Sequence, residues 1–212
     1  MKWLEFLNIT QKLPLINTEI LLSGVSNPRP AKVQISRWEK AGKIIQLRRG
    51  IYLLAEPYRQ RELFEPYIAA VLKEPSYISL EKALEFHGLI PEAVAVYTSV
   101  TPKRPRKFVS KVGVFNYQHI KTSLFWGYNS VTVRKQTAFI ASPEKALLDL
   151  VYLKNIKVSA DYLEEMRLQS LEKINPNILM SYAQRFAKPG ILRAAGIIKK
   201  FIQNESGKEE EL

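Results

Sequence analysis

The chain contains no cysteine, which excludes disulfide bonds, thiolate metal sites and cysteine nucleophiles. It has only two aspartates, Asp149 and Asp161, and they form no Asp-x-Asp or Asp-x-Glu pair. Nucleotidyl transfer, which uses clustered carboxylates to hold divalent cations, is therefore not expected. The two histidines, His87 and His119, have no second ligand at metal-binding spacing, so we interpret each as a cap or packing residue.

Long apolar runs and catalytic motifs are missing as well. No run of about 18 apolar residues occurs, and the apolar stretch at the start of the chain is too short and too charged for a signal peptide. Gly-x-Ser-x-Gly and phosphate-loop motifs are absent. Asp149 lies in an apolar helical stretch, where we expect a structural salt bridge or hydrogen bond. We expect a cytoplasmic protein that is not an enzyme, binds no metal or cofactor and does not enter a membrane.

Positive charge, in contrast, is abundant. The chain has 32 Lys and Arg against 20 Asp and Glu, a net charge of +12. Residues 1–56 carry 9 basic and 4 acidic side chains, residues 57–204 carry 22 and 12, and residues 205–212 carry 1 and 4. Because both larger segments are basic, we expect a polyanionic partner that can contact either of them.

Residues 16–54 have the order of elements of a winged helix-turn-helix. Thr18 is a typical N-cap for a first short helix, and residues 24–28 contain the Gly, Ser, Asn and Pro of a tight turn. Pro30 suits the first turn of a second helix, and Gly42 suits its end.

A hairpin is predicted directly after this second helix. Residues 44–48 and 51–55 are rich in β-branched and aromatic side chains, and Arg49 and Gly50 between them form the turn. In winged helix-turn-helix proteins the second helix contacts base edges and the hairpin contacts phosphates. The segment therefore predicts a domain, residues 1–56, that binds double-stranded DNA.

The helical wheel of residues 30–41 separates an apolar side from a basic one. Ala31, Ile35 and Trp38 fall on the inner side. The residues expected to contact DNA are Arg29, Lys32, Val33, Ser36, Arg37 and Lys40 of the helix with Arg48 and Arg49 of the hairpin. The alternative is a small helical domain whose basic face is merely solvated.

The rest of the chain predicts a mixed α/β domain, residues 57–204, and a disordered acidic tail, residues 205–212. Strands in antiparallel pairs are expected between residues 95 and 141, one of them over residues 124–128, and helices dominate the C-terminal end. The helices are expected over residues 59–73, kinked or restarted at Pro66, and over residues 80–87, 143–153, 160–170, 176–187 and 191–203. Ser79 and Ser142 are the expected N-caps of the second and third of these helices. The predicted class is thus α+β, with a winged helix-turn-helix followed by an α/β domain.

Five cations lie within nine residues of this second domain, interrupted by prolines that keep them out of a helix. They are Lys103, Arg104, Arg106, Lys107 and Lys111. This secondary basic patch is either a second phosphate contact or an edge strand protected by charge. Aromatic residues at strand spacing, such as Phe115 and Tyr117, resemble a stacking platform for single strands, but sheet core is the favoured interpretation.

Five segments in this order resemble the AbiEi-type antitoxins of type IV toxin-antitoxin systems, over about residues 16–153. They are IIQLRRGIYLL, YISLEKALEFHGLIPE, VYTSVTPKRPRKF, GVFNYQHIKTSLFWGY and ASPEKALLDLVYL. The resemblance implies a winged domain that represses its own promoter and a C-terminal domain with antitoxicity and some DNA contact. The partner it implies is a nucleotidyltransferase-like toxin, counteracted without a stable complex. One alternative is a winged-helix regulator that senses a ligand through Trp126, Tyr128 and His119. Another is a nucleic-acid enzyme, although the scarcity of carboxylates argues against it.

Overall fold

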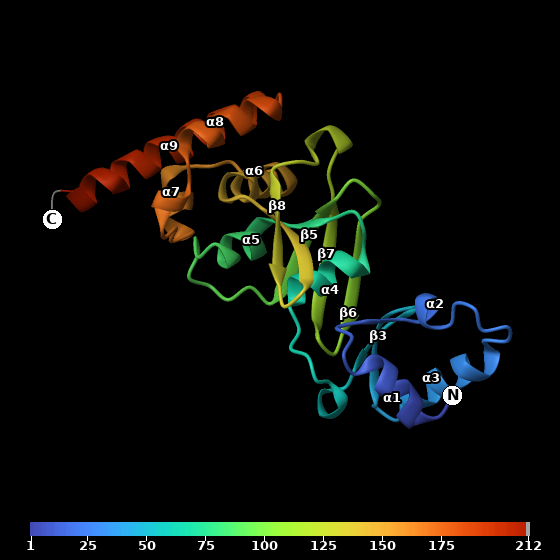
Figure 1. Ribbon diagram of the computed structural model, residues 1–212. Helices are drawn as coiled ribbons and strands as arrows, with labels where there is room; N and C mark the ends of the chain where they lie inside the picture. Colours follow the sequence, from blue (N-terminus) through green and yellow to red (C-terminus); the bar gives the residue numbers. More distant parts are fainter. Residues whose placement is uncertain (211–212) are drawn as a thin grey trace.

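The computed structural model describes residues 1–210, with side chains to residue 205, and contains a smaller and a larger β-sheet (Figure 1). The smaller sheet belongs to residues 1–55, here called the N-terminal unit. The larger sheet belongs to the remainder, the C-terminal unit. Helices accompany both sheets, so the predicted α+β class is confirmed. No helix in the described range is long and apolar enough to cross a membrane.

The N-terminal unit packs its helices on one face of the smaller sheet. Its elements are α1 (Trp3–Thr10), β1 (Ile16–Asn17), α2 (Thr18–Leu21), α3 (Arg29–Lys40), β2 (Ile44–Arg48) and β3 (Ile51–Leu54). Strand β3 is central and pairs antiparallel with β1 and β2. The second helix and the hairpin occur where the sequence predicts them, whereas α1 was not predicted.

Aromatic rings fill the core between α1 and α3. Phe6 is fully buried, and its ring centroid lies 4.7 Å from that of Trp38 and 5.7 Å from that of Trp3. Ile35 and Ile44 belong to the same apolar cluster. Because Ile35 and Trp38 share one side of α3, their burial determines which side of this helix faces outward.

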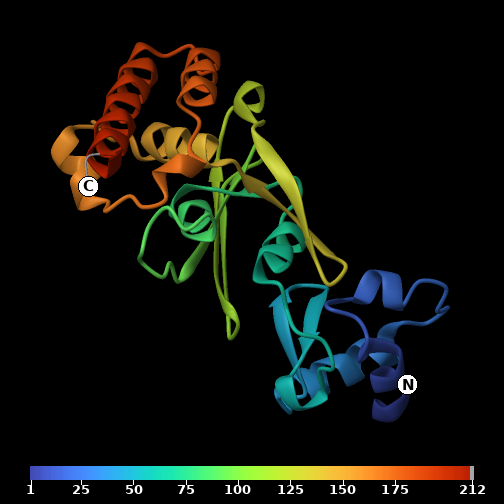
Figure 2. The same ribbon diagram turned by 60° about the vertical axis from the view of Figure 1, so that its left-hand side comes forward.

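The opposite face of the smaller sheet packs against the C-terminal unit. Leu47 and Leu53 belong to the same apolar core as Ile68 and Leu72 of helix α4 (Glu65–Leu72). Figure 2 shows α4 between the two sheets. The two units therefore share a buried apolar interface.

The larger sheet is mixed, with strand order β6-β7-β5-β4-β9-β8. Its strands are β4 (Tyr77–Ile78), β5 (Val96–Thr101), β6 (Arg106–Ser110), β7 (Gly113–His119), β8 (Tyr128–Val133) and β9 (Gln136–Ala141). β5 pairs with β7 and β4 with β9 in parallel, so the prediction of antiparallel strands is wrong for these pairs. The alternation of apolar residues reports the faces of a strand but not the direction of its partner.

Helix α6 is the buried helix of the C-terminal unit. The helical segments outside the N-terminal unit, besides α4, are η1 (Glu56–Tyr58), α5 (Leu80–Phe86), η2 (Thr122–Leu124), α6 (Pro143–Lys154), α7 (Ala160–Glu165), η3 (Leu171–Lys173), α8 (Pro176–Arg185) and α9 (Pro189–Glu210). The Ser142 hydroxyl accepts the backbone N–H of Lys145 at 3.3 Å, so the predicted cap of α6 is confirmed. Helix α9 continues to Glu210, within the segment expected to be a disordered tail, and residues 211 and 212 lie outside the described residues.

The helix expected over residues 59–73 begins only at Glu65, with Pro66 in its first turn. The predicted restart at Pro66 is therefore confirmed, whereas the helical segment expected before it is wrong. The strand expected over residues 124–128 is wrong as well: Leu124 ends η2, residues 125–127 form a loop in which Gly127 has a φ of +77°, and β8 begins only at Tyr128. That left-handed conformation favours glycine and interrupts an extended strand.

Candidate nucleic-acid interface and a buried polar cluster

The outer side of α3 is exposed as the helical wheel predicts. Its side chains with open access to solvent are Arg29, Lys32, Val33, Ser36, Arg37 and Lys40. The half-buried acid Glu39 lies next to them at the margin of this side. The packed side contains Ile35 and Trp38, so the exposed cations are held on a helix whose orientation is determined by the core.

The turn before α3 and the start of α2 depend on asparagines. The side chain of Asn27 accepts the backbone N–H of Arg29 at 3.2 Å. Asn17, not the predicted Thr18, caps α2 by accepting the N–H of Glu19 at 2.9 Å. Both the N–H and the hydroxyl of Thr18 instead donate to the carbonyl of Gly50, at 2.9 and 3.2 Å. The start of α2 is thereby tied to the hairpin turn.

Arg49 at the hairpin turn lies on the same side of the molecule as α3. Arg49, Gly50 and Lys32 line one groove, together with Thr18 and Tyr52. Gly50 has a φ of +85°, which a side chain would strain. Of the predicted helix contacts, Lys32 therefore shares a groove with the predicted hairpin contact Arg49, and the acid Glu19 lines the same groove.

Arg48 points elsewhere. Its guanidinium donates to the carbonyl of Val71 at 3.5 Å, in the last turn of α4. A β-bulge between Gln46 and Arg48 breaks the register of the hairpin at this point. A cation at the C-terminal end of a helix is favoured by the helix dipole. Arg48 thus lies at the junction of the units, away from the groove that contains Arg49.

The secondary basic patch lies on β6, an edge strand of the larger sheet, and on its flanking turns. Arg106 pairs with Tyr117 and Lys107 with Asn116, so the two cations point to opposite faces of the sheet. Phe115 and Tyr117 of the neighbouring strand are buried, which confirms their interpretation as sheet core.

The members of this patch differ in their contacts. The Lys103 ammonium donates to the carbonyl of Glu74 at 2.6 Å, and the Arg106 guanidinium lies 4.9 Å from the centre of the Phe108 ring. The remaining members, Arg104, Lys107 and Lys111, are exposed. Lys103 and Arg106 are therefore held by contacts within the protein, whereas the other three cations are available to a binding partner.

A cation that the sequence did not single out connects the two predicted basic surfaces. Burial lowers the pKa of Lys73, and the charges of Lys103, Arg106 and Arg48 lower it further. Lys111 also lines the same shallow pocket as Lys40 of α3. Cations of both units thus lie close together, because α4 and β6 are packed against the hairpin.

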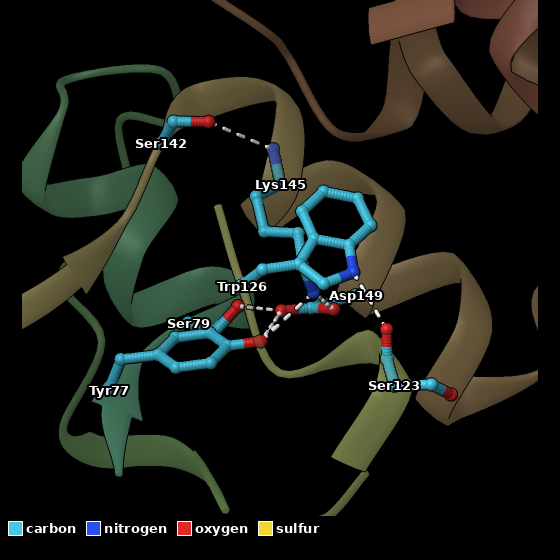
Figure 3. Close-up of polar contacts among 7 residues, drawn as sticks. All are labelled: Tyr77, Ser79, Ser123, Trp126, Ser142, Lys145 and Asp149. Atoms are coloured by element: carbon cyan, nitrogen blue, oxygen red, sulfur yellow. Dashed lines mark hydrogen bonds and ion pairs between the residues drawn. The ribbon is translucent and has the colours of Figure 1, made fainter. Parts of the chain in front are cut away.

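A polar cluster lies at the centre of the C-terminal unit (Figure 3). Asp149 forms an ion pair with Lys145, one helical turn earlier, and both side chains are fully buried. The Tyr77 hydroxyl donates to Asp149 at 2.8 Å and the Ser79 hydroxyl at 2.9 Å. The structure confirms the salt bridge expected for Asp149 and adds these two hydrogen bonds.

Burial dominates the acid–base behaviour of this cluster. It lowers the pKa of Lys145 and raises the pKa of Asp149, and the attraction between them opposes both shifts. Burial also raises the pKa of Tyr77 above its ordinary value.

Gly127 leaves room for the aliphatic part of the Lys145 side chain. A Cβ at position 127 would approach that side chain to 3.0 Å.

The residues of the predicted ligand pocket are not brought together. Trp126 packs against Tyr182, with the Arg185 guanidinium 3.7 Å from its ring centre. His119 is exposed and contacts the carbonyl of Lys103. The ring of Tyr128 stacks on that of Tyr77, with centroids 4.7 Å apart, and Tyr128 lines a separate apolar pocket.

No group of three or more His, Asp or Glu side chains that could hold a metal ion occurs among the described residues. Comparison with models of known protein families and with curated proteins gives no match for this chain. The functional interpretation therefore depends on the residues and their arrangement.

Proposed function

We propose that the N-terminal unit is a winged helix-turn-helix that binds double-stranded DNA and represses its own operon, with α3 as the recognition helix. One observation carries the proposal: the exposed side of α3 is basic, its opposite side is anchored by Trp38, and Arg49 of the hairpin opens onto the same groove as Lys32. This combination suits a helix in the major groove and a hairpin on the phosphates.

Replacing Arg37 by alanine is expected to weaken binding to the specific promoter duplex by about 1–3 kcal/mol, or about 5- to 150-fold, if Arg37 contacts a base edge. The Arg49→Ala variant should weaken binding to the specific and the scrambled duplex alike, because a phosphate contact carries no sequence information. It should also lower the slope of log affinity against log salt concentration by about one. Gel-shift titrations at several salt concentrations measure both effects.

The matched control is Lys12→Ala, which removes an exposed cation outside α3 and the hairpin. It should change the affinity for the promoter far less than Arg37→Ala does. Equal binding of promoter and scrambled duplexes by the unmodified protein would contradict sequence-specific recognition.

We further propose that the C-terminal unit counteracts a nucleotidyltransferase-like toxin encoded beside this gene, without a stable complex. This part depends on the resemblance of the five segments to AbiEi-type antitoxins. It is supported by the excess of basic side chains in residues 57–204, 22 against 12 acidic ones, which suits an acidic partner or nucleic acid.

Charge reversal of the free cations of the β6 patch tests this role. The double variant Arg104→Glu/Lys107→Glu is expected to lose rescue of growth, or to bind DNA more weakly, because both side chains are exposed. Co-expression with the neighbouring toxin measures rescue, and gel shifts measure DNA binding. The control, Lys199→Glu/Lys157→Glu, reverses two charges elsewhere in the same unit. A β6 variant with normal rescue and normal DNA binding would show that this patch has no part in either activity.

A further inference from the structure

A groove lies between the C-terminal end of α6 and the N-terminal half of α9, and is here called the α6–α9 groove. Helix α9 lies at the end of the molecule remote from the N-terminal unit (Figure 1, Figure 2). The volume of the groove is about 700 Å³. This size falls within the range of roughly 300–1,000 Å³ that is typical of sites for small molecules.

Apolar side chains form much of the wall of the α6–α9 groove. Gly190, Ala194 and Ile197 recur at helical spacing along α9 and line the groove, together with Val151 and Val158. A Cβ at Gly190 would meet no atom of another segment within 4 Å, so the groove is open at this position. A wall of this kind suits the apolar body of a ligand.

Hydrogen-bond donors also line the groove, and no acid does. The exposed side chains of Lys188, Arg193 and Asn155 are among its lining residues, which include neither Asp nor Glu. Lys188 and Arg193 form no ion pair with the described side chains. The Lys188 ammonium lies 4.4 Å from the centre of the Tyr152 ring, which lines the groove as well. This cation–π contact keeps the ammonium at the groove.

The surroundings of the groove are positive too. Residues 174–204, which contain α8 and most of α9, have five cations and no acid. Helix α7 packs against α9 and carries Asp161, Glu164 and Glu165, but none of these acids lines the groove. The charge around the groove therefore favours an anionic ligand over a neutral or cationic one.

We propose that the α6–α9 groove binds a small organic anion that has an apolar body. Lys188 and Arg193 bind the anionic group, and the side-chain amide of Asn155 donates a further hydrogen bond to it. The apolar wall covers the body of the ligand. The site goes beyond the proposed DNA binding and antitoxicity and depends on neither.

The test compares three compounds that share one apolar body and differ in charge, on the full chain at constant ionic strength. They are 4-phenylbutyrate, 4-phenylbutan-1-ol and 4-phenylbutylamine. The anion is expected to shift the methyl resonances of Val158, Ile191 and Ile197, which line the groove. The alcohol should bind at least about fivefold more weakly, and the amine more weakly still. Methyl NMR titration measures the three dissociation constants at the same residues.

One pair of variants tests the charge. Lys188→Gln/Arg193→Gln should weaken binding of 4-phenylbutyrate at least about fivefold and leave the affinity for the alcohol unchanged. The control, Lys199→Gln/Lys200→Gln, removes two cations of α9 that do not line the groove, and should bind 4-phenylbutyrate far better than the first variant does.

A second pair tests the apolar wall. Ile197→Ala should weaken binding of 4-phenylbutyrate and of the alcohol alike, by about threefold or more. Leu192→Ala is the control, because Leu192 is similarly exposed on the same helix but does not line the groove. Equal affinity for the anion and the alcohol, shifts absent from these methyl groups, or equal weakening by the variants and their controls would each overturn the proposal. Gel shifts with the same samples report separately on the proposed DNA binding.

Discussion

The Lys145→Met variant is expected to lose about 3–5 kcal/mol of its free energy of unfolding, because it leaves the carboxylate of Asp149 buried without its counter-ion. Tyr77 and Ser79 still donate to Asp149, but two neutral hydroxyls do not replace a positive charge. Urea denaturation followed by circular dichroism measures the change.

The double variant Lys145→Met/Asp149→Leu is the test of this explanation. Removing both charges eliminates the buried unpaired ion, so the double variant should recover much of the stability that the single variant loses. Lys154→Met is the matched control on the same helix, because Lys154 pairs with Glu81 at the surface and should contribute no more than about 1 kcal/mol. A Lys145→Met variant as stable as Lys154→Met would contradict the buried ion pair.

The Phe6→Ala variant is expected to destabilise the protein by about 3–5 kcal/mol. Phe6 is fully buried and its ring packs against those of Trp3 and Trp38, which also contact each other. Truncation leaves a cavity beside the helix that carries the proposed DNA contacts. Thermal and urea unfolding measure the loss.

Leu4 of the same helix provides the control. Its side chain is 70% exposed, whereas Phe6 is 0% exposed. Leu4→Ala should therefore change the free energy of unfolding by no more than about 0.5 kcal/mol. Similar losses for Leu4→Ala and Phe6→Ala would mean that α1 does not pack against α3 as described.

Local patterns predicted α3 and its exposed side well. Pro30, the spacing of Ile35 and Trp38, and Gly42 all act within one or two helical turns, where sequence and conformation are closely related. The hairpin turn at Gly50 was predictable for the same reason, since a positive φ favours glycine. The exposure of the proposed contact residues on α3 was predictable because amphipathic periodicity directly reports exposure.

Contacts between distant segments were not predictable in this way. β4 has only the residues Tyr77 and Ile78, too few for an alternating pattern, and its parallel partner β9 follows much later in the chain. The contact of Arg48 with Val71 depends on packing between units and left no signal within the hairpin. The participation of Lys73 in the basic surface depends on the same packing.

The buried polar cluster was partly predictable from the sequence. Lys145 and Asp149 are four residues apart in an apolar helix, and that spacing is the signal for an ion pair within a helix. Ser79 occupies the expected N-cap position of α5, but its hydroxyl donates to Asp149 and forms no cap. The hydroxyl therefore donates to a distant side chain instead of accepting a backbone N–H at the start of α5, and no local pattern reveals that contact.

The apolar interface between the hairpin and α4 limits how this chain can evolve. Leu47 and Leu53 belong to one buried core with Ile68 and Leu72, so each unit supplies part of the other's core. Exchange of residues 1–55 between unrelated genes would expose these leucines unless the new neighbour offered a complementary surface. The two units are thus expected to be inherited together, and a change in one side of the interface to be matched by a change in the other.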